Sequence, residues 1–208
     1  MSFSIKGLYL VTPDCDDTAL LCEQVTQALR GGVAIVQYRH KTATEALRLE
    51  QAAALLALCR GAQIPFLIND HVDLAAHLDA DGVHVGQNDR AVTQARALLG
   101  KQKIIGASCY NQFSLAEHAQ AAGADYVAFG ACYPSSTKPN APRAETALFA
   151  QARQQLSVPV VGIGGITLEN ARPLITAGAD ALAVISDIFQ SHDITARCRA
   201  YQSLFASN

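Results

Sequence analysis

The chain has 208 residues, of which half are hydrophobic and 16% are charged, and this composition suits one folded domain over residues 1–208 and excludes an intrinsically disordered protein. A formal net charge of −2 argues against general nucleic-acid binding, so we expect no nucleic-acid partner. The N-terminus has no secretory pattern, and no apolar run reaches about 18 residues. We therefore expect a cytoplasmic protein with no membrane partner.

Short apolar runs alternate with amphipathic segments along the whole chain. The apolar runs predict strands over residues 7–11, 33–39, 65–68, 82–85, 103–107, 126–129, 159–163 and 181–185. The amphipathic segments predict helices over residues 18–30, 44–60, 72–78, 90–99, 114–122, 145–156, 168–177 and 194–204. Eight β/α units predict an α/β fold of the TIM (β/α)8 barrel class. A doubly wound open sheet is the alternative, although Thr12-Pro13-Asp14 replaces its glycine-rich first turn.

The turns into the even-numbered strands resemble one another. Gly123-Ala124-Asp125 and Gly178-Ala179-Asp180 each lead from a predicted helix into an apolar strand, and Asp79-Ala80-Asp81 does the same. Their spacing is irregular, so we interpret them as a repeated helix-turn-strand unit rather than as a solenoid.

The second predicted strand ends in polar residues. Gln37, Arg39 and Lys41 alternate with Tyr38 and His40, so the two sets are expected on opposite faces. Two cations and an amide at a strand end lose solvation unless an anion or an acidic partner meets them. The pattern fits an anion clamp at the barrel mouth, and it also fits an ion-paired strand end.

The loops after the strands carry the function of a TIM barrel, and polar residues follow nearly every predicted strand. They are Asn69 and Asp70 after the third strand, Gln87, Asn88 and Asp89 after the fourth, Ser108 after the fifth, Ser135, Ser136, Thr137 and Lys138 after the sixth, Gly164 and Gly165 after the seventh, and Ser186 after the eighth. Their convergence indicates a binding site at this end of the barrel.

Asp70 and Asp89 each immediately precede a predicted helix. A helix N-cap is one interpretation of both residues. The second interpretation is a site for a hard divalent ion, of which Mg²⁺ is the most favoured. Mg²⁺ needs only one or two carboxylates beside waters and phosphate oxygens. Zinc is less favoured because His71 and His77 lack metal-ligand spacing. His84 is interpreted as a structural histidine.

Residues 162–167 offer backbone N–H groups before a helix, which favours a phosphate cradle, although the glycines could serve only a tight turn. Their place after the seventh strand, with Ser186 after the eighth, matches the usual phosphate corner of TIM barrels.

The six cysteines form no C-x-x-C pair, which favours reduced thiols. Packing is a better interpretation of Cys109 and Cys132 than nucleophilic catalysis.

These motifs together resemble the thiamine-phosphate synthase family over essentially the whole chain. The matching segments are Gln37-Tyr38-Arg39-His40-Lys41, Asn69-Asp70, residues 81–89, Gly106-Ala107-Ser108, residues 130–138, residues 162–167 and Val184-Ile185-Ser186. The resemblance implies a TIM barrel that joins hydroxymethylpyrimidine diphosphate to a thiazole phosphate, giving thiamine phosphate and pyrophosphate. It also implies a dissociative substitution, in which the carbon–oxygen bond breaks before the thiazole nitrogen attacks.

The resemblance assigns roles by position. Gln37, Arg39, Lys41 and Asn69 would hold the pyrimidine diphosphate, flanked by Tyr38 and His40. Asp70 and Asp89 would bind the cofactor Mg²⁺. Arg39, Lys41, Lys138 and Ser108 would act on the leaving group. The thiazole phosphate would be held by a further set: Ser135, Ser136, Thr137, Gly165, Ile185 and Ser186.

The chain departs from the family pattern at three positions. His40 stands where the family usually has Glu, Ala131 where it has Pro, and Ser135 where it has Thr. A thiazole tautomerase of the same superfamily and a non-catalytic binder of thiamine precursors are the alternatives. The presence of Asp70, Asp89, Arg39 and Lys138 together favours the synthase over the tautomerase. The sequence leaves open whether the chain forms a homo-oligomer.

Overall fold

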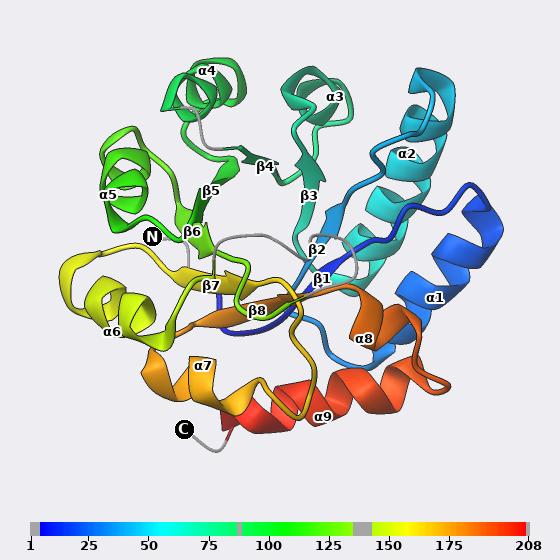
Figure 1. Cartoon of the computed structure of the whole chain (residues 1–208). Helices are drawn as coiled ribbons and strands as arrows, with labels where there is room; N and C mark the ends of the chain where they lie inside the picture. Colours follow the sequence, from blue (N-terminus) through cyan, green and yellow to red (C-terminus); the bar gives the residue numbers. More distant parts are fainter. Residues whose placement is uncertain (1–4, 87–88, 135–142, 207–208) are drawn as a thin grey trace.

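Eight parallel strands close into a barrel in chain order, with helices around it (Figure 1). The computed structural model describes residues 5–86, 89–134 and 143–206, without the side chains of residues 89 and 90. The strands are β1 (Gly7–Val11), β2 (Ile35–Tyr38), β3 (Phe66–Asn69), β4 (Gly82–Val85), β5 (Ile104–Tyr110), β6 (Tyr126–Phe129), β7 (Val160–Ile163) and β8 (Ala181–Val184). The helices are α1 (Thr18–Arg30), α2 (Glu45–Ala62), α3 (Val72–His77), α4 (Asp89–Leu99), α5 (Phe113–Ala121), α6 (Thr146–Gln155), α7 (Arg172–Ala177), α8 (Ser186–Phe189) and α9 (Ile194–Ala206). The TIM-barrel prediction is confirmed.

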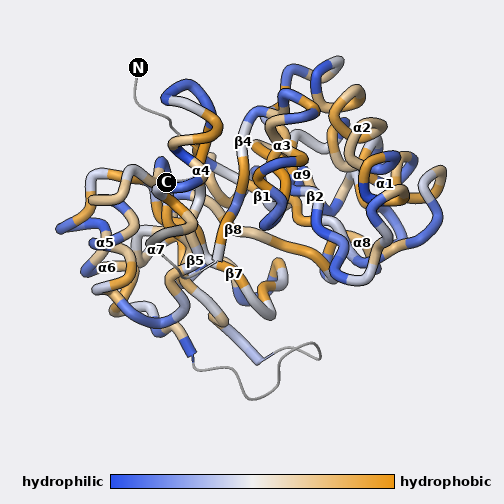
Figure 2. Tube along the Cα trace, turned by 90° about the horizontal axis from the view of Figure 1, so that it is seen from above, coloured by the Kyte–Doolittle hydropathy of each residue, from blue (hydrophilic) through white to orange (hydrophobic). Residues whose placement is uncertain are grey.

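The strands separate two hydrophobic clusters. Alternate side chains point to opposite faces of a strand, so one set fills the barrel and the other meets the helices. The interior cluster includes Tyr9, Ile35, Leu67, Tyr126 and Val161. The larger cluster packs between the sheet and the helices. Figure 2 shows the strands running mainly in orange through the middle, with most blue on the surrounding helices and loops.

The repeated turn into the even strands has a structural cause. Asp81, Asp125 and Asp180 each accept a hydrogen bond from a backbone N–H at the start of the preceding strand, namely those of Phe66, Ile105 and Val160, at 2.8, 2.7 and 2.8 Å. A carboxylate at this position provides an acceptor for a backbone N–H that the hydrogen bonds between the strands leave unpaired. These aspartates therefore close the base of the barrel, at the end opposite the predicted site.

Several predicted boundaries need correction. β2 begins at Ile35 rather than at residue 33, and β5 continues to Tyr110 with a register shift after Ser108. α7 begins at Arg172 rather than at residue 168, because Asn170 holds the preceding turn by accepting from the Thr167 N–H at 2.9 Å. The four-residue α8 was not predicted, since one turn is too short to show helical periodicity.

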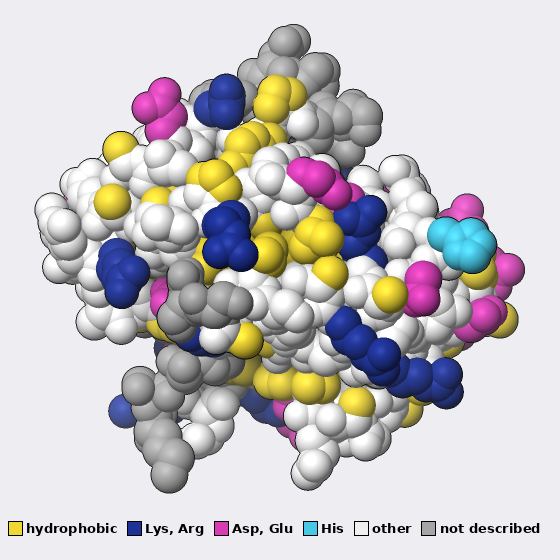
Figure 3. Space-filling view, turned by 90° about the horizontal axis from the view of Figure 1, so that it is seen from below, with side chains coloured by type: hydrophobic (Ala, Val, Ile, Leu, Met, Phe, Trp, Pro, Cys, Tyr) yellow, Lys and Arg dark blue, Asp and Glu magenta, His cyan; other side chains and the backbone are white. Residues whose placement is uncertain are grey.

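Within the described residues, no helix combines the length and apolarity that crossing a membrane requires. On the face shown in Figure 3, Lys and Arg side chains lie scattered among acidic and hydrophobic groups rather than in one continuous patch.

Candidate active site

The carboxyl ends of the strands form one rim of the barrel, and this rim collects the described members of the predicted site. Gln37, Asn69 and Ser108 lie within the strands β2, β3 and β5. Arg39 and Lys41 follow β2, and Asp70 follows β3. On the same rim, beyond β1, Gly165 follows β7, and Ile185 and the exposed Ser186 follow β8.

The loop after β1 fixes the predicted anion clamp. Thr12 Oγ1 accepts from the Arg39 N–H at 2.8 Å and donates to the Arg39 carbonyl at 3.0 Å. Asp14 Oδ1 accepts from the Lys41 N–H at 2.9 Å and lies 3.4 Å from Arg39 Nη1. Sequence reasoning assigned no role to Asp14. Its only signal was an acidic residue in the loop that follows the neighbouring strand.

Tyr38 and His40 face the helix layer, as the alternation along β2 predicts, and their place beside the pyrimidine diphosphate stays a prediction. The Tyr38 hydroxyl donates to Gln51 Oε1 of α2 at 2.9 Å, and burial raises the pKa of Tyr38 to about 12. His40 Nε2 lies 3.1 Å from Asp16 Oδ1, and its Nδ1 has no hydrogen-bond partner among the described residues. Both side chains are buried and support β2 from behind.

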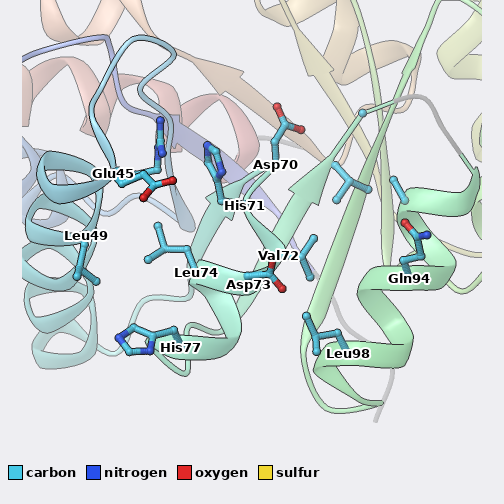
Figure 4. A pocket seen from close by; sticks show the side chains of 14 residues that line it. Glu45, Leu49, Asp70, His71, Val72, Asp73, Leu74, His77, Gln94 and Leu98 are labelled. Carbon is cyan, nitrogen blue, oxygen red and sulfur yellow. The ribbon is translucent and has the colours of Figure 1, made fainter.

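Asp70 occupies a left-handed backbone conformation with a φ of 60° directly after β3. Its exposed carboxylate accepts from Asn69 Nδ2 at 2.8 Å, and its N–H donates to the His84 carbonyl at 2.9 Å. The N-cap interpretation of Asp70 is wrong, because His71 holds the cap position of α3 and no side chain caps that helix. An aspartate tolerates this backbone better than most residues, and its carboxylate points away from α3 (Figure 4).

His84 lies buried inside the barrel, in agreement with its interpretation as a structural histidine. Its Nε2 lies 2.9 Å from Ser108 Oγ, and its Nδ1 lies 2.9 Å from the Tyr126 hydroxyl. Burial lowers the pKa of His84 to about 4, so the imidazole is neutral at pH 7. Gln37 is 4% exposed and donates to the Tyr9 hydroxyl at 2.6 Å. The barrel interior is therefore polar beneath the rim.

The glycine loop after β7 is braced from two sides. Gly165 has a φ of 63°, and a Cβ there would lie 2.5 Å from the Pro134 carbonyl oxygen and 2.6 Å from that of Tyr133. Asn170 Nδ2 donates to the Gly165 carbonyl at 3.0 Å. The loop therefore lies directly against the chain that leads into residues 135–142.

Two hollows adjoin the rim at β3. The smaller, about 180 Å³, is lined by Tyr38, His40, Lys41, Arg48, Asn69, Asp70 and His71. The larger, about 780 Å³, extends from Asp70 over α3 between α2 and α4 (Figure 4). Both meet the rim at Asp70, so that carboxylate borders the two hollows.

Five of the predicted ligands belong to the part of the chain that the structure does not describe in full. Ser135, Ser136, Thr137 and Lys138 lie outside the described residues, and Asp89 opens α4 with its side chain outside them. Among the described residues, no group of three or more His, Cys, Asp or Glu side chains could hold a metal. Burial raises the pKa of the Cys132 thiol to about 12, which suits packing rather than nucleophilic attack.

Comparison with known proteins gives a consistent result. The family model described as "Thiamine monophosphate synthase" matches residues 8–188. A thiamine-phosphate synthase of Methylobacillus flagellatus is 56% identical over 97% of this chain and 96% of its own length. Another, from Aromatoleum aromaticum, is 53% identical over 97% of each chain. A solved structure of a thiamine phosphate pyrophosphorylase from Pyrococcus furiosus superposes with a TM-score of 0.84 at 31% identity, covering 97% of this chain and 96% of its own.

Proposed function

The chain belongs to the thiamine monophosphate synthase family, a group of transferases, and from this membership we propose a dissociative, Mg²⁺-assisted reaction at the rim of its barrel. The pyrimidine diphosphate would lose pyrophosphate first, and the thiazole phosphate nitrogen would then attack the resulting cation. The products are thiamine phosphate and pyrophosphate.

The separation of two polar arcs on one rim carries this proposal. Arg39, Lys41, Asn69 and Asp70 follow or end the adjacent strands β2 and β3. Gly165 and Ser186 follow the adjacent strands β7 and β8. A reaction between a diphosphate and a monophosphate needs two anion sites that face one reacting centre, and these two sets of residues would form them.

The residues present suit Mg²⁺. Asp70 offers an exposed carboxylate whose one described side-chain partner is Asn69, and oxygen ligands are those that Mg²⁺ prefers. Asp70 and Asp89 would hold the ion, with diphosphate oxygens and waters as its other ligands. When bound, the ion would offset negative charge on the leaving oxygens.

The chain's own residues would position and stabilise the reacting groups. Arg39 and Lys41 would meet charge that develops on the leaving oxygens, with Lys138 beside them. Ser108 would donate a hydrogen bond to the same group, and Gln37 would meet the pyrimidine. Ser135, Ser136, Thr137, Gly165, Ile185 and Ser186 would hold the thiazole phosphate. No side chain needs to act as a nucleophile in this scheme.

Substituted substrates test the dissociative step. An electron-withdrawing group on the pyrimidine ring destabilises a cation, so turnover of that substrate should fall by about 10²-fold or more. Equal rates for substituted and unsubstituted substrates would contradict the proposal and favour direct displacement. Isomerisation of a thiazole phosphate without use of the diphosphate would instead indicate the tautomerase.

The cytoplasm is the proposed location. All six cysteines are free thiols in the structure, and such thiols persist in reducing compartments. Cell fractionation with an antibody to the chain tests this, and recovery outside the soluble fraction would contradict it.

A further inference from the structure

Five side chains form one hydrogen-bonded series across the barrel interior, from β2 to β5. Gln37 Nε2 donates to the Tyr9 hydroxyl at 2.6 Å, and this hydroxyl lies 2.7 Å from that of Tyr126. The Tyr126 hydroxyl lies 2.9 Å from His84 Nδ1, and His84 Nε2 lies 2.9 Å from Ser108 Oγ. We call this series, Gln37-Tyr9-Tyr126-His84-Ser108, the interior relay.

The barrel is shaped to hold the relay. Tyr9 is 1% and Tyr126 is 0% exposed, and their rings meet edge to face with centroids 5.9 Å apart. Tyr126 also stacks on His84 with ring centroids 5.6 Å apart. A Cβ at Gly106, the residue in register with Tyr126 on β5, would overlap the Tyr126 phenol. Glycine at position 106 therefore makes the space that this phenol occupies.

The first donor sets the direction of the later bonds. Because the Gln37 amide donates to Tyr9, the Tyr9 oxygen is an acceptor, and its own proton has Tyr126 as its only acceptor among the described residues. A hydroxyl that accepts a hydrogen bond becomes a stronger donor, and His84 Nδ1, 2.9 Å from the Tyr126 oxygen, can accept from it. In that arrangement the neutral imidazole would carry its proton on Nε2 and donate it to Ser108 Oγ, 2.9 Å away.

We propose that Tyr126 and His84 are positioning residues that orient the Ser108 hydroxyl, by fixing His84 as the Nε2–H tautomer. The Ser108 oxygen accepts from His84, and its proton is left to donate toward the rim. Reversal of the Gln37 amide would reverse every bond in the relay. Ser108 would then donate to His84 and present only lone pairs to the rim.

The consequence for catalysis rests on the proposed function. A hydroxyl fixed as a donor suits an anionic diphosphate, because it needs no reorientation as negative charge grows on the leaving oxygens. The relay also joins Gln37, on the pyrimidine side, to Ser108, on the diphosphate side. It therefore links the orientation of two predicted substrate contacts that lie on different strands.

Nitrogen NMR of histidine-labelled chain tests the tautomer without any assay of activity. The spectrum of His84→Gln identifies the His84 resonances by their loss. We expect a protonated Nε2 and an unprotonated, hydrogen-bonded Nδ1, and Tyr126→Phe should shift the Nδ1 resonance. Tyr201→Phe is the matched control, because it removes a buried hydroxyl that bonds Asp187 outside the relay. A proton on Nδ1, or an unchanged Nδ1 resonance in Tyr126→Phe, would overturn the proposal.

A double-mutant cycle tests whether the relay acts through Ser108. Tyr126→Phe should lower kcat/KM for the pyrimidine diphosphate about three- to tenfold, and Ser108→Ala about ten- to a hundredfold. The double variant should be no worse than Ser108→Ala within about twofold. Multiplied losses would show that Tyr126 acts independently of Ser108 and would refute the coupling. Absence of turnover in the unmodified chain would refute the proposed function and leave the tautomer result standing.

Discussion

Asp14 accepts a hydrogen bond from the backbone N–H of Lys41 over 2.9 Å, and this bond joins the loop after β1 to the end of β2. β2 itself ends at Tyr38, so strand geometry alone does not place Lys41. The same carboxylate oxygen lies 3.4 Å from Arg39 Nη1. The two cations of the predicted clamp are therefore positioned by one residue of a neighbouring loop.

Asp14 variants separate positioning from charge. Asp14→Ala removes the acceptor and should raise KM for the pyrimidine diphosphate about five- to tenfold. Asp14→Asn keeps an oxygen for the Lys41 N–H and should stay within about twofold of the unmodified chain. Steady-state kinetics at fixed ionic strength measure both. Equal losses in the two variants would mean that the negative charge, rather than the hydrogen bond, is what matters.

Asp70→Asn tests the proposed metal ligand without straining the backbone, because asparagine also tolerates the left-handed conformation. We expect at least about a tenfold loss of turnover, partly recovered at high Mg²⁺. Asp73→Asn, which alters an exposed carboxylate on the adjacent α3, is the control and should keep its activity. Turnover like that of the unmodified chain at low Mg²⁺ would remove Asp70 from the metal site.

Gly165→Ala should harm both stability and the thiazole phosphate site. The added Cβ would crowd the Pro134 and Tyr133 carbonyls, and its φ of 63° disfavours an L side chain. We expect a loss of about 1–3 kcal/mol in the free energy of unfolding and a higher KM for the thiazole phosphate. Gly61→Ala, in α2 with open space around it, should be neutral or stabilising by up to about 1 kcal/mol. Urea unfolding distinguishes these outcomes, and equal effects at both positions would contradict the role of Gly165.

His84 predicts a pH dependence of stability. Its pKa in the folded chain is about 4, against about 6.5 for an exposed histidine. Between these values the unfolded chain binds more protons, so the free energy of unfolding falls as the pH drops from about 6.5 to about 4. At about pH 4.5, protonation of His84 in the unfolded chain lowers the free energy of unfolding by roughly 2–3 kcal/mol relative to neutral pH. His84→Gln should lose less stability between about pH 7 and pH 4.5 than the unmodified chain does. Parallel losses in the two proteins would contradict the buried, neutral state of His84.

Much of the fold was predictable from local sequence. The strands β1, β4 and β6 and the helix α1 have the predicted boundaries, because apolar runs and capping residues such as Asp17 mark them clearly. The missed α8 and the late start of α7 depend on single turns and on the Asn170 side chain. Such features lack the periodicity from which longer helices are predicted.

The candidate site was predictable at its rim and not in its interior. Polar residues after strands stood out in the sequence, whereas Tyr9 and Tyr126 looked like ordinary apolar strand residues. Their hydroxyls matter only because barrel closure brings β1, β4 and β6 around one axis. His40 acquires an explanation in the same way. Its Nε2 lies 3.1 Å from Asp16 Oδ1 and its Nδ1 lies 3.9 Å from Asp14 Oδ1, so it bridges two acidic residues of the loop after β1.

The most direct test of the central claim is a product assay with both substrates. Purified chain is incubated with hydroxymethylpyrimidine diphosphate, thiazole phosphate and Mg²⁺, and thiamine phosphate and pyrophosphate are quantified together. We predict equal amounts of the two products, and none when either substrate is omitted. Absence of thiamine phosphate with both substrates and metal present would contradict the synthase function.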